Sequence, residues 1–175
     1  MTQGYTERTY QARRLEIGVD RPFEEFRRQY EQAVPRYDAA AFDALVARRA
    51  SWDDVLALMG ERAPHDFLIY WSSGELRPMM SLAGDAGNAV EYLMGNHTIA
   101  EKMYRHDPTA MLYAPLRTMI GDLPDGGVRF VIEQPSCTFG SFGVDAIHEV
   151  GRQLDREVAA LLAHLDVPVP ADLSS

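Results

Sequence analysis

A tight turn between two alternating runs of residues is the feature that most constrains the fold of this chain. The turn, Leu-Pro-Asp-Gly-Gly, spans positions 123–127 and lies between apolar runs at 111–120 and 127–134. Its glycines provide the positive φ angles that tight hairpin turns need. We therefore expect two neighbouring antiparallel strands here, within a larger antiparallel sheet.

Alternating or β-branched and aromatic runs indicate further strands. These are expected at 10–19, 67–71, 76–82 and 90–94. Helical spacing of apolar residues, together with capping signals, predicts helices at 20–35, 38–49, 51–60, 98–106 and 144–165. This order predicts an α+β fold of two layers, with a mostly antiparallel sheet, helices on one face and a long C-terminal helix.

Length and composition exclude several classes of protein. The 175 residues are consistent with one domain over 1–175, with flexible tails at 1–9 and 166–175. The net charge of −9 argues against a nucleic-acid partner. The single cysteine, Cys137, rules out an internal disulfide and a cysteine-based zinc cage. Because no apolar run would span a membrane and the polar N-terminal residues lack a secretory signal, we expect a soluble, cytoplasmic protein with no membrane partner.

One face of the predicted hairpin gathers polar side chains that could handle a ligand. Alternation places Tyr113, Arg117 and Met119 on the face opposite the core, and Glu133 joins them from the partner strand. Arg117 could hold a carboxylate or enolate through a forked pair of hydrogen bonds. Glu133 would be its general base, and Tyr113 would supply a hydrogen bond. The alternative is a cross-strand ion pair on a solvated sheet face.

His97 is the other catalytic candidate, because it lies in the first turn of a predicted helix beside Asn96. Free N–H groups at a helix start favour anions, and an imidazole there could donate a hydrogen bond or transfer a proton. The alternative is a polar residue of the helix cap, where Thr98 and Glu101 have capping-box spacing. The other histidines are scattered, so we expect no metal site and no cofactor.

A segment rich in Ser, Gly and Phe at 136–143 follows the hairpin and is interpreted as a mobile loop that covers a pocket on the sheet. Aromatic, methionine and amide side chains would line that pocket. The candidates for substrate contact are Asn96, Tyr92, Tyr70, Met119, Phe139 and Phe142. Cys137 lies in the same segment without a catalytic signature, and is interpreted as a buried neutral thiol.

The stretch from Tyr92 to Pro135 contains residues that resemble a known family. They are Gly95-Asn96, Ala100, Met103, Pro115-Leu116-Arg117, and Asp125-Gly126-Gly127 before a strand. In these residues the chain resembles the DUF302 family, a bacterial and archaeal domain of unknown function. The resemblance implies a compact α+β domain with helices on one sheet face, commonly a homodimer, and it brings no catalytic residues. The family usually has proline where this chain has His97, and the helix at 38–49 looks like an insertion.

These observations lead to two hypotheses about function. The first is a small-molecule-binding domain that acts as a cofactor-independent enzyme, with proton-transfer chemistry such as isomerisation, cyclisation or elimination on an apolar or aromatic substrate. His97, Arg117, Glu133 and Tyr113 would be its catalytic residues. The alternative is a non-catalytic homodimer that binds an apolar ligand or haem. A third possibility is an interaction subunit whose sheet face is entirely dimer interface.

Overall fold

A five-stranded antiparallel sheet organises the protein, as a computed structural model of residues 4–123 and 126–174 shows. The strand order is β1-β5-β4-β3-β2, so the first strand along the chain pairs with the last. The strands are β1 Arg14–Val19, β2 Leu68–Ser72, β3 Ala89–Gly95, β4 Leu116–Asp122 and β5 Val128–Glu133. The predicted hairpin is the β4–β5 pair, in which Asp122 lies opposite Val128. Pro124 and Asp125 of its turn lie outside the described residues.

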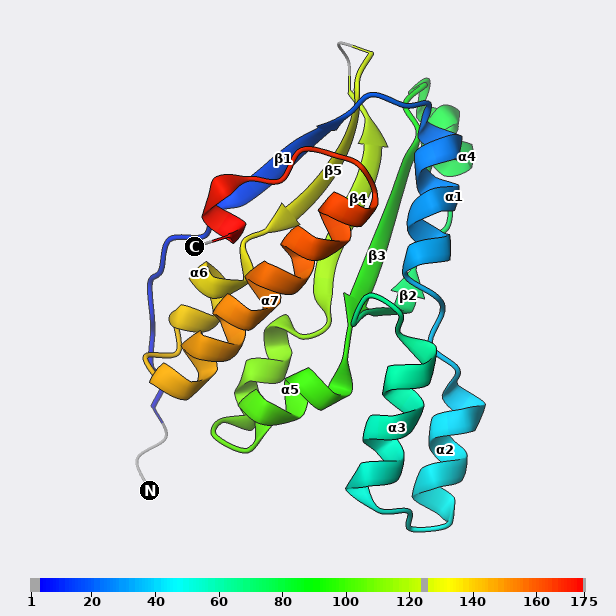
Figure 1. The fold of residues 1–175 in the computed structure, drawn as a ribbon. Coiled ribbons are helices and arrows are strands. Elements are labelled where there is room, and N and C mark those ends of the chain that lie inside the picture. The colour runs from blue at the N-terminus through cyan, green and yellow to red at the C-terminus, as the bar shows by residue number, and fades with distance from the viewer. Residues whose placement is uncertain (1–3, 124–125, 175) are drawn as a thin grey trace.

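The helices lie over one face of this sheet and beyond one end of it (Figure 1). The α-helices are α1 Phe23–Ala33, α2 Ala39–Ala47, α3 Trp52–Arg62, α4 Arg77–Met80, α5 His97–Tyr104, α6 Pro135–Gly140 and α7 Asp145–His164. Short 3-10 turns are η1 Ser81–Ala83, η2 Pro108–Tyr113 and η3 Ala171–Leu173. The predicted α+β class, the antiparallel sheet and the long C-terminal helix are confirmed. None of the helices in the described part of the chain has the length and apolarity needed to cross a membrane.

The main core fills the space between the sheet and helices α1 and α7. Tyr30 of α1 is fully buried, and its ring packs against Tyr92 and Phe130 with centroids 5.0 and 5.7 Å apart. Its hydroxyl lies 3.2 Å from Thr118 Oγ1, so the polar group buried with the ring has a partner. Alternation along β4 and β5 places every second residue in this core, which is why Ile120 and its neighbours are buried.

The opposite face of the sheet is not covered by a helix. Arg117 and Met119 of β4 are exposed on it, and so is Trp71 of edge strand β2. An antiparallel sheet tolerates one solvated face, and the sequence encodes this by alternating apolar with polar residues. This uncovered face carries two of the candidate residues, Arg117 and Met119.

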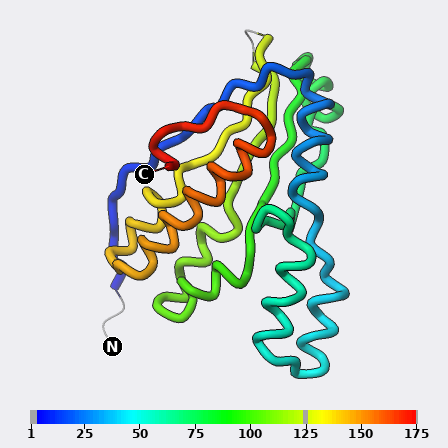
Figure 2. Tube along the Cα trace, viewed as in Figure 1, coloured from blue at the N-terminus to red at the C-terminus, as the bar shows by residue number. Residues whose placement is uncertain are grey.

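Helices α2 and α3 form a hairpin that extends beyond the end of the sheet (Figure 2). A second, smaller core of Phe42, Met59, Ala63 and Leu68 joins the hairpin to the sheet. A capping box starts helix α3: the Ser51 hydroxyl accepts from Asp54 N at 3.2 Å, and Asp54 Oδ2 accepts from Ser51 N at 3.0 Å.

Two predicted strands differ from the structure. The segment 76–82 is helical rather than a strand, because Pro78 enters the first turn of α4 and Gly84, at φ 95°, ends the following 3-10 turn. In 111–120 the strand begins only at Leu116, since Asp107 caps the 3-10 turn η2 and Pro108 starts it. Leu112, which strand alternation would place on the core face, is consequently 78% exposed.

The predicted loop at 136–143 begins as helix α6. Pro135 occupies its first turn, and the buried Asp155 of α7 accepts a 2.9 Å hydrogen bond from Ser136 N. A carboxylate from another helix thus serves as the cap that the local sequence lacks. The segment after α7 also folds back onto the domain, where Val167 and Leu173 are buried.

Candidate functional site

Four of the residues predicted from the sequence line one hollow on the uncovered sheet face. They are Tyr113, Arg117, Met119 and Glu133, and the hollow has a volume of about 760 Å³. We call it the sheet-face hollow. Other residues that line it are Tyr10, Arg14, Leu93, Leu112, Val131 and Thr138. Its floor is largely aliphatic, while the arginines, the glutamate and the tyrosines provide its polar groups.

The two arginines of the sheet-face hollow are each paired through one nitrogen. Arg117 Nε lies 2.9 Å from Glu91 Oε1, and Arg14 Nε lies 2.9 Å from Glu16 Oε1. Apart from these two glutamates, neither arginine has a hydrogen bond or ion pair with a residue in the described ranges 4–123 and 126–174. The rest of each guanidinium can bind an anion, as this planar group commonly does.

Glu133 is the acidic residue of the sheet-face hollow. It lies opposite Arg14 in the β1–β5 pairing, and within the described part of the chain its carboxylate has no hydrogen bond or ion pair. The charge of Glu133 also affects Tyr10. Hydrogen bonding to Tyr113, burial and the Glu133 charge together raise the pKa of Tyr10 to about 12. The hollow thus contains an exposed carboxylate and, at neutral pH, a protonated phenol.

Of the two phenylalanines predicted to cover the pocket, only Phe142 lies near the residues of the sheet-face hollow. Phe142 packs edge-on against Tyr113, with ring centroids 6.0 Å apart, and Tyr10 approaches the same ring at 6.1 Å. Phe139 is fully buried in the main core, so it is a core residue and does not line the hollow. Helix α6 instead borders the hollow through Pro135 and Thr138.

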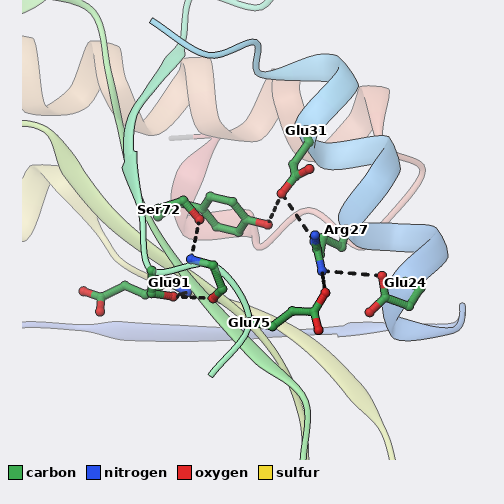
Figure 3. A network of polar contacts seen from close by, with 9 residues as sticks. Glu24, Arg27, Glu31, Ser72, Glu75 and Glu91 are labelled. Carbon is green, nitrogen blue, oxygen red and sulfur yellow. Dashed lines mark hydrogen bonds and ion pairs between the residues drawn. The ribbon is translucent and has the colours of Figure 1, made fainter. Parts of the chain in front are cut away.

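Tyr92, another predicted contact residue, lies on the helix-covered face of the sheet. It is buried, and its hydroxyl donates to Glu31 Oε1 at 2.9 Å. Glu31 also pairs with Arg27, which binds Glu24 and Glu75 as well (Figure 3). Hydrogen bonding to Glu75 and the neighbouring carboxylates raises the pKa of Arg27 above its usual range. The position of Tyr92 is structural and excludes it from the sheet-face hollow.

His97 and Tyr70 line a second, smaller cavity of about 220 Å³ beneath helix α5, which we call the His97 cavity. Most of its other walls are apolar, including Ile99, Ala100 and Met103. It adjoins the sheet-face hollow, and the segment from Ala114 to Leu116 lines both. His97 thus lines this cavity, whereas Arg117 and Glu133 line the sheet-face hollow, although the sequence analysis assigned all three to one site.

The side chain of His97 is held by aromatic residues from three elements. Its Nδ1 lies 2.8 Å from the Tyr70 hydroxyl. Tyr70, Tyr37 and Phe42 form a continuous stack, with centroids 4.7 and 4.9 Å apart, and the His97 ring meets all three at steep angles. Burial lowers the pKa of His97, so the imidazole is neutral at pH 7.

Asn96 is the N-cap of helix α5, and both the oxygen and the nitrogen of its side-chain amide make hydrogen bonds. Its Oδ1 accepts from Thr98 N at 2.9 Å and from Thr98 Oγ1 at 2.7 Å, while its Nδ2 donates to Asp66 O at 2.9 Å. The capping box predicted between Thr98 and Glu101 is therefore wrong, because the helix starts two residues earlier. Asn96 therefore fixes the start of helix α5, where His97 follows it, and it also lines the cavity described above.

Metal and haem binding can be tested against these residues. In the described ranges, no group of three or more His, Cys, Asp and Glu side chains is placed to hold a metal ion. A haem would need room beside His97, but the cavity of about 220 Å³ is smaller than the roughly 300–1,000 Å³ of pockets for drug-sized ligands. The residues around His97 therefore do not fit a haem.

The sequence interpretation missed several residues of these two sites. Tyr10 and Arg14 precede or begin the edge strand β1, and only the pairing of β1 with β5 brings them to the hairpin. Phe42 lies in the helix predicted at 38–49, and Tyr37 lies just before that helix, where no role was predicted for it. No local signal connects them with His97, because their stack forms between distant parts of the chain.

Comparison with known proteins bears on the fold. No family model matches the chain, and no curated protein matches it. The crystal structure of the uncharacterized conserved protein DUF302 from Bacillus stearothermophilus is similar over 87% of this chain and 97% of that chain, with a TM-score of 0.61 and 12% sequence identity. The chain therefore has a DUF302-like fold.

Proposed function

We propose that this protein binds a small, mainly apolar molecule with an acidic group in the sheet-face hollow and catalyses proton transfer on it without a cofactor. The supporting observation is the arrangement of Glu133, which has no ion pair with any described residue and lies between two arginines over an aliphatic floor. Isomerisation, cyclisation and elimination are the reaction classes that such a set serves.

Each polar residue has a role in this proposal. The terminal amino groups of Arg117 bind the carboxylate or developing enolate, because a guanidinium forms paired hydrogen bonds with such groups. Glu133 removes a proton from carbon as the general base. Tyr113 supplies a hydrogen bond. The apolar body of the substrate lies on Met119 and its aliphatic neighbours.

Phenylpyruvate is a suitable probe, because it combines an aromatic body, a carboxylate and an acidic carbon-bound proton. NMR in D₂O follows exchange of its C3 protons with the wild-type protein, Arg117→Met, Glu133→Gln and the control Arg28→Met. Arg28 is exposed on helix α1 and does not line the hollow. We expect Glu133→Gln to abolish catalysed exchange with binding retained, and Arg117→Met to weaken binding about tenfold or more.

The rival function is a non-catalytic homodimer that uses the sheet face. Exposed apolar side chains favour it: Trp71 is 48%, Met119 37% and Leu112 78% exposed. The face also carries both Arg117 and Glu91, so a second copy could meet it with complementary charges. A second copy placed there would also close the hollow.

Sedimentation of the wild type and of Trp71→Arg tests the rival. A dimer that dissociates in the variant, combined with phenylpyruvate binding but no exchange, would support the binding protein. A monomer that catalyses exchange would support the enzyme. Absence of both binding and exchange with this probe would count against the proposed substrate class.

We further propose that the chain is a single domain and that it acts in the cytoplasm. Its single cysteine supports the cytoplasmic location, because proteins of oxidising compartments commonly use disulfides.

A further inference from the structure

The hydrogen bond between His97 and Tyr70 determines which nitrogen of the imidazole carries its proton. The Tyr70 hydroxyl is largely buried, and His97 Nδ1 is the only acceptor that it reaches among the described residues. If Nδ1 carried the proton, the Tyr70 O–H would have no acceptor, at the cost of an unsatisfied buried donor. Tyr70 therefore donates, Nδ1 accepts, and the proton of neutral His97 is on Nε2.

The second nitrogen of His97 is accessible. Nε2 makes no hydrogen bond to any residue of the described ranges. Within those ranges, every fully buried side-chain nitrogen or oxygen atom has a partner. Because Nε2 has none, it is not fully buried, and His97 is one of the residues that line the His97 cavity.

The His97 cavity has the size and lining for a single substituted ring. Its volume of about 220 Å³ exceeds the roughly 150 Å³ of an engineered apolar cavity that binds benzene. Isoleucine, alanine, methionine and leucine side chains dominate its walls, with few polar groups beside them. A ligand here would gain affinity from apolar burial and orientation from one hydrogen bond.

We propose that the His97 cavity is a binding site for a small monocyclic molecule with one hydrogen-bond acceptor, such as a ketone, which receives the Nε2–H of His97. Tyr70 is a positioning residue, because it acts on the ligand only by fixing the tautomer and orientation of the imidazole. This site is separate from the sheet-face hollow, so it extends the proposed function and does not depend on it.

Long-range ¹H–¹⁵N NMR of the protein at pH 7.5 reads the tautomer of His97 directly. We expect the Nε2–H form to dominate in the wild type and to lose that dominance in Tyr70→Phe, which keeps the ring in the aromatic stack but removes the donor. A dominant Nδ1–H form in the wild type, or a tautomer ratio that Tyr70→Phe leaves unchanged, would overturn the assigned role of Tyr70.

Binding is tested with acetophenone and cumene, which have the same skeleton and differ in the carbonyl group. Titrations followed by NMR should show acetophenone binding about threefold to tenfold more tightly, the usual effect of one hydrogen bond. His97→Phe should remove this preference. Ala100→Leu fills the cavity from helix α5 while keeping both members of the His97–Tyr70 pair, and should abolish binding of both probes while the tautomer signal persists.

The outcomes separate this proposal from the proposed function. Arg117→Met should leave acetophenone binding unchanged, because Arg117 does not line the His97 cavity. Equal affinities for acetophenone and cumene, no binding of either, or binding unaffected by Ala100→Leu would each refute the proposed site. Any of these results would leave the phenylpyruvate experiment on the sheet-face hollow unaffected.

Discussion

The two faces of one sheet differ sharply in what they do for this protein. On the covered face, Tyr30, Tyr92 and Phe130 pack together, and the hydroxyl groups of both tyrosines have hydrogen-bond partners. On the uncovered face, Arg117 pairs with Glu91 alone among the described residues, and Glu133 has no ion pair with a described residue. The same strands supply both faces. Along β4 and β5, residues that pack in the core alternate with residues that are candidates for ligand contact.

This difference shows where substitutions are tolerated. A face that packs against helices loses free energy with each atom removed, whereas a face that meets solvent can change side chains at little cost. Candidate functional residues on the uncovered face can therefore be tested without unfolding the protein.

Neighbouring residues of β4 give the sharpest test. Ile120 is fully buried, while Met119, the residue before it, is 37% exposed on the other face. We expect Ile120→Ala to lower the free energy of unfolding by about 2–5 kcal/mol, and Met119→Ala by less than about 1 kcal/mol. Urea denaturation measures both. Similar losses in the two variants would mean that the uncovered face is buried in solution, as a dimer would require.

Two tyrosines extend the comparison to polar groups. Tyr30→Phe removes a buried hydroxyl that contacts Thr118 and Met94, so we expect a loss of about 1 kcal/mol. Tyr113→Phe, at the sheet-face hollow, should change the free energy of unfolding by less than about 0.5 kcal/mol. The comparison fails if Tyr113→Phe is the more destabilising of the two.

The pH dependence of stability reports on two partly buried histidines. Burial lowers the pKa of His97, and burial followed by the charge of His164 lowers that of His65. Both groups favour the neutral form when folded, so their contribution is complete above the unfolded pKa of about 6.5 and is lost as pH falls through the folded pKa. The free energy of unfolding should therefore decrease from pH 7.5 to 5.5. His65→Gln and His97→Gln should each reduce that decrease, and an unchanged pH profile in both would contradict this.

The smallest effect is expected for the ion pair of the uncovered face. The Arg117 side chain is 78% exposed, and exposed pairs contribute from zero to about 1 kcal/mol. Arg117→Met should shift the free energy of unfolding by less than about 0.5 kcal/mol. Denaturation at low and high salt checks this, and a loss several times larger would show that Arg117 is paired more extensively than in the monomer.

The sequence predicts the two faces of β4 and β5 well, because side-chain alternation is a local property. Thr118, Ile120 and Phe130 are buried as expected, and Arg117 and Glu133 point outward. The pattern fails at Tyr113, where a 3-10 turn replaces the strand, since the cap at Asp107 and the proline after it outweigh the alternation.

The candidate sites were less predictable, because they depend on contacts between distant elements. The stack of Phe42, Tyr37 and Tyr70 joins α2, the segment before it and β2, and no spacing in the sequence indicates it. Helix α6 was interpreted as a loop because its cap, Asp155, comes from another helix. Local signals identified individual residues, and the tertiary structure decided which of them share a cavity.

The pairing of the first strand with the last has a consequence for synthesis. Glu16 and Arg129, which bind each other across β1 and β5 at 2.9 Å, are 113 residues apart in the chain. At ~5–20 residues per second, a ribosome needs roughly ten seconds between making the two. During that time β1 has no strand partner, and its exposed Arg14 and Glu16 carry charges that oppose pairing with other chains. The charges on β1 thus oppose aggregation of the nascent chain, before Glu16 pairs with Arg129 in the folded protein.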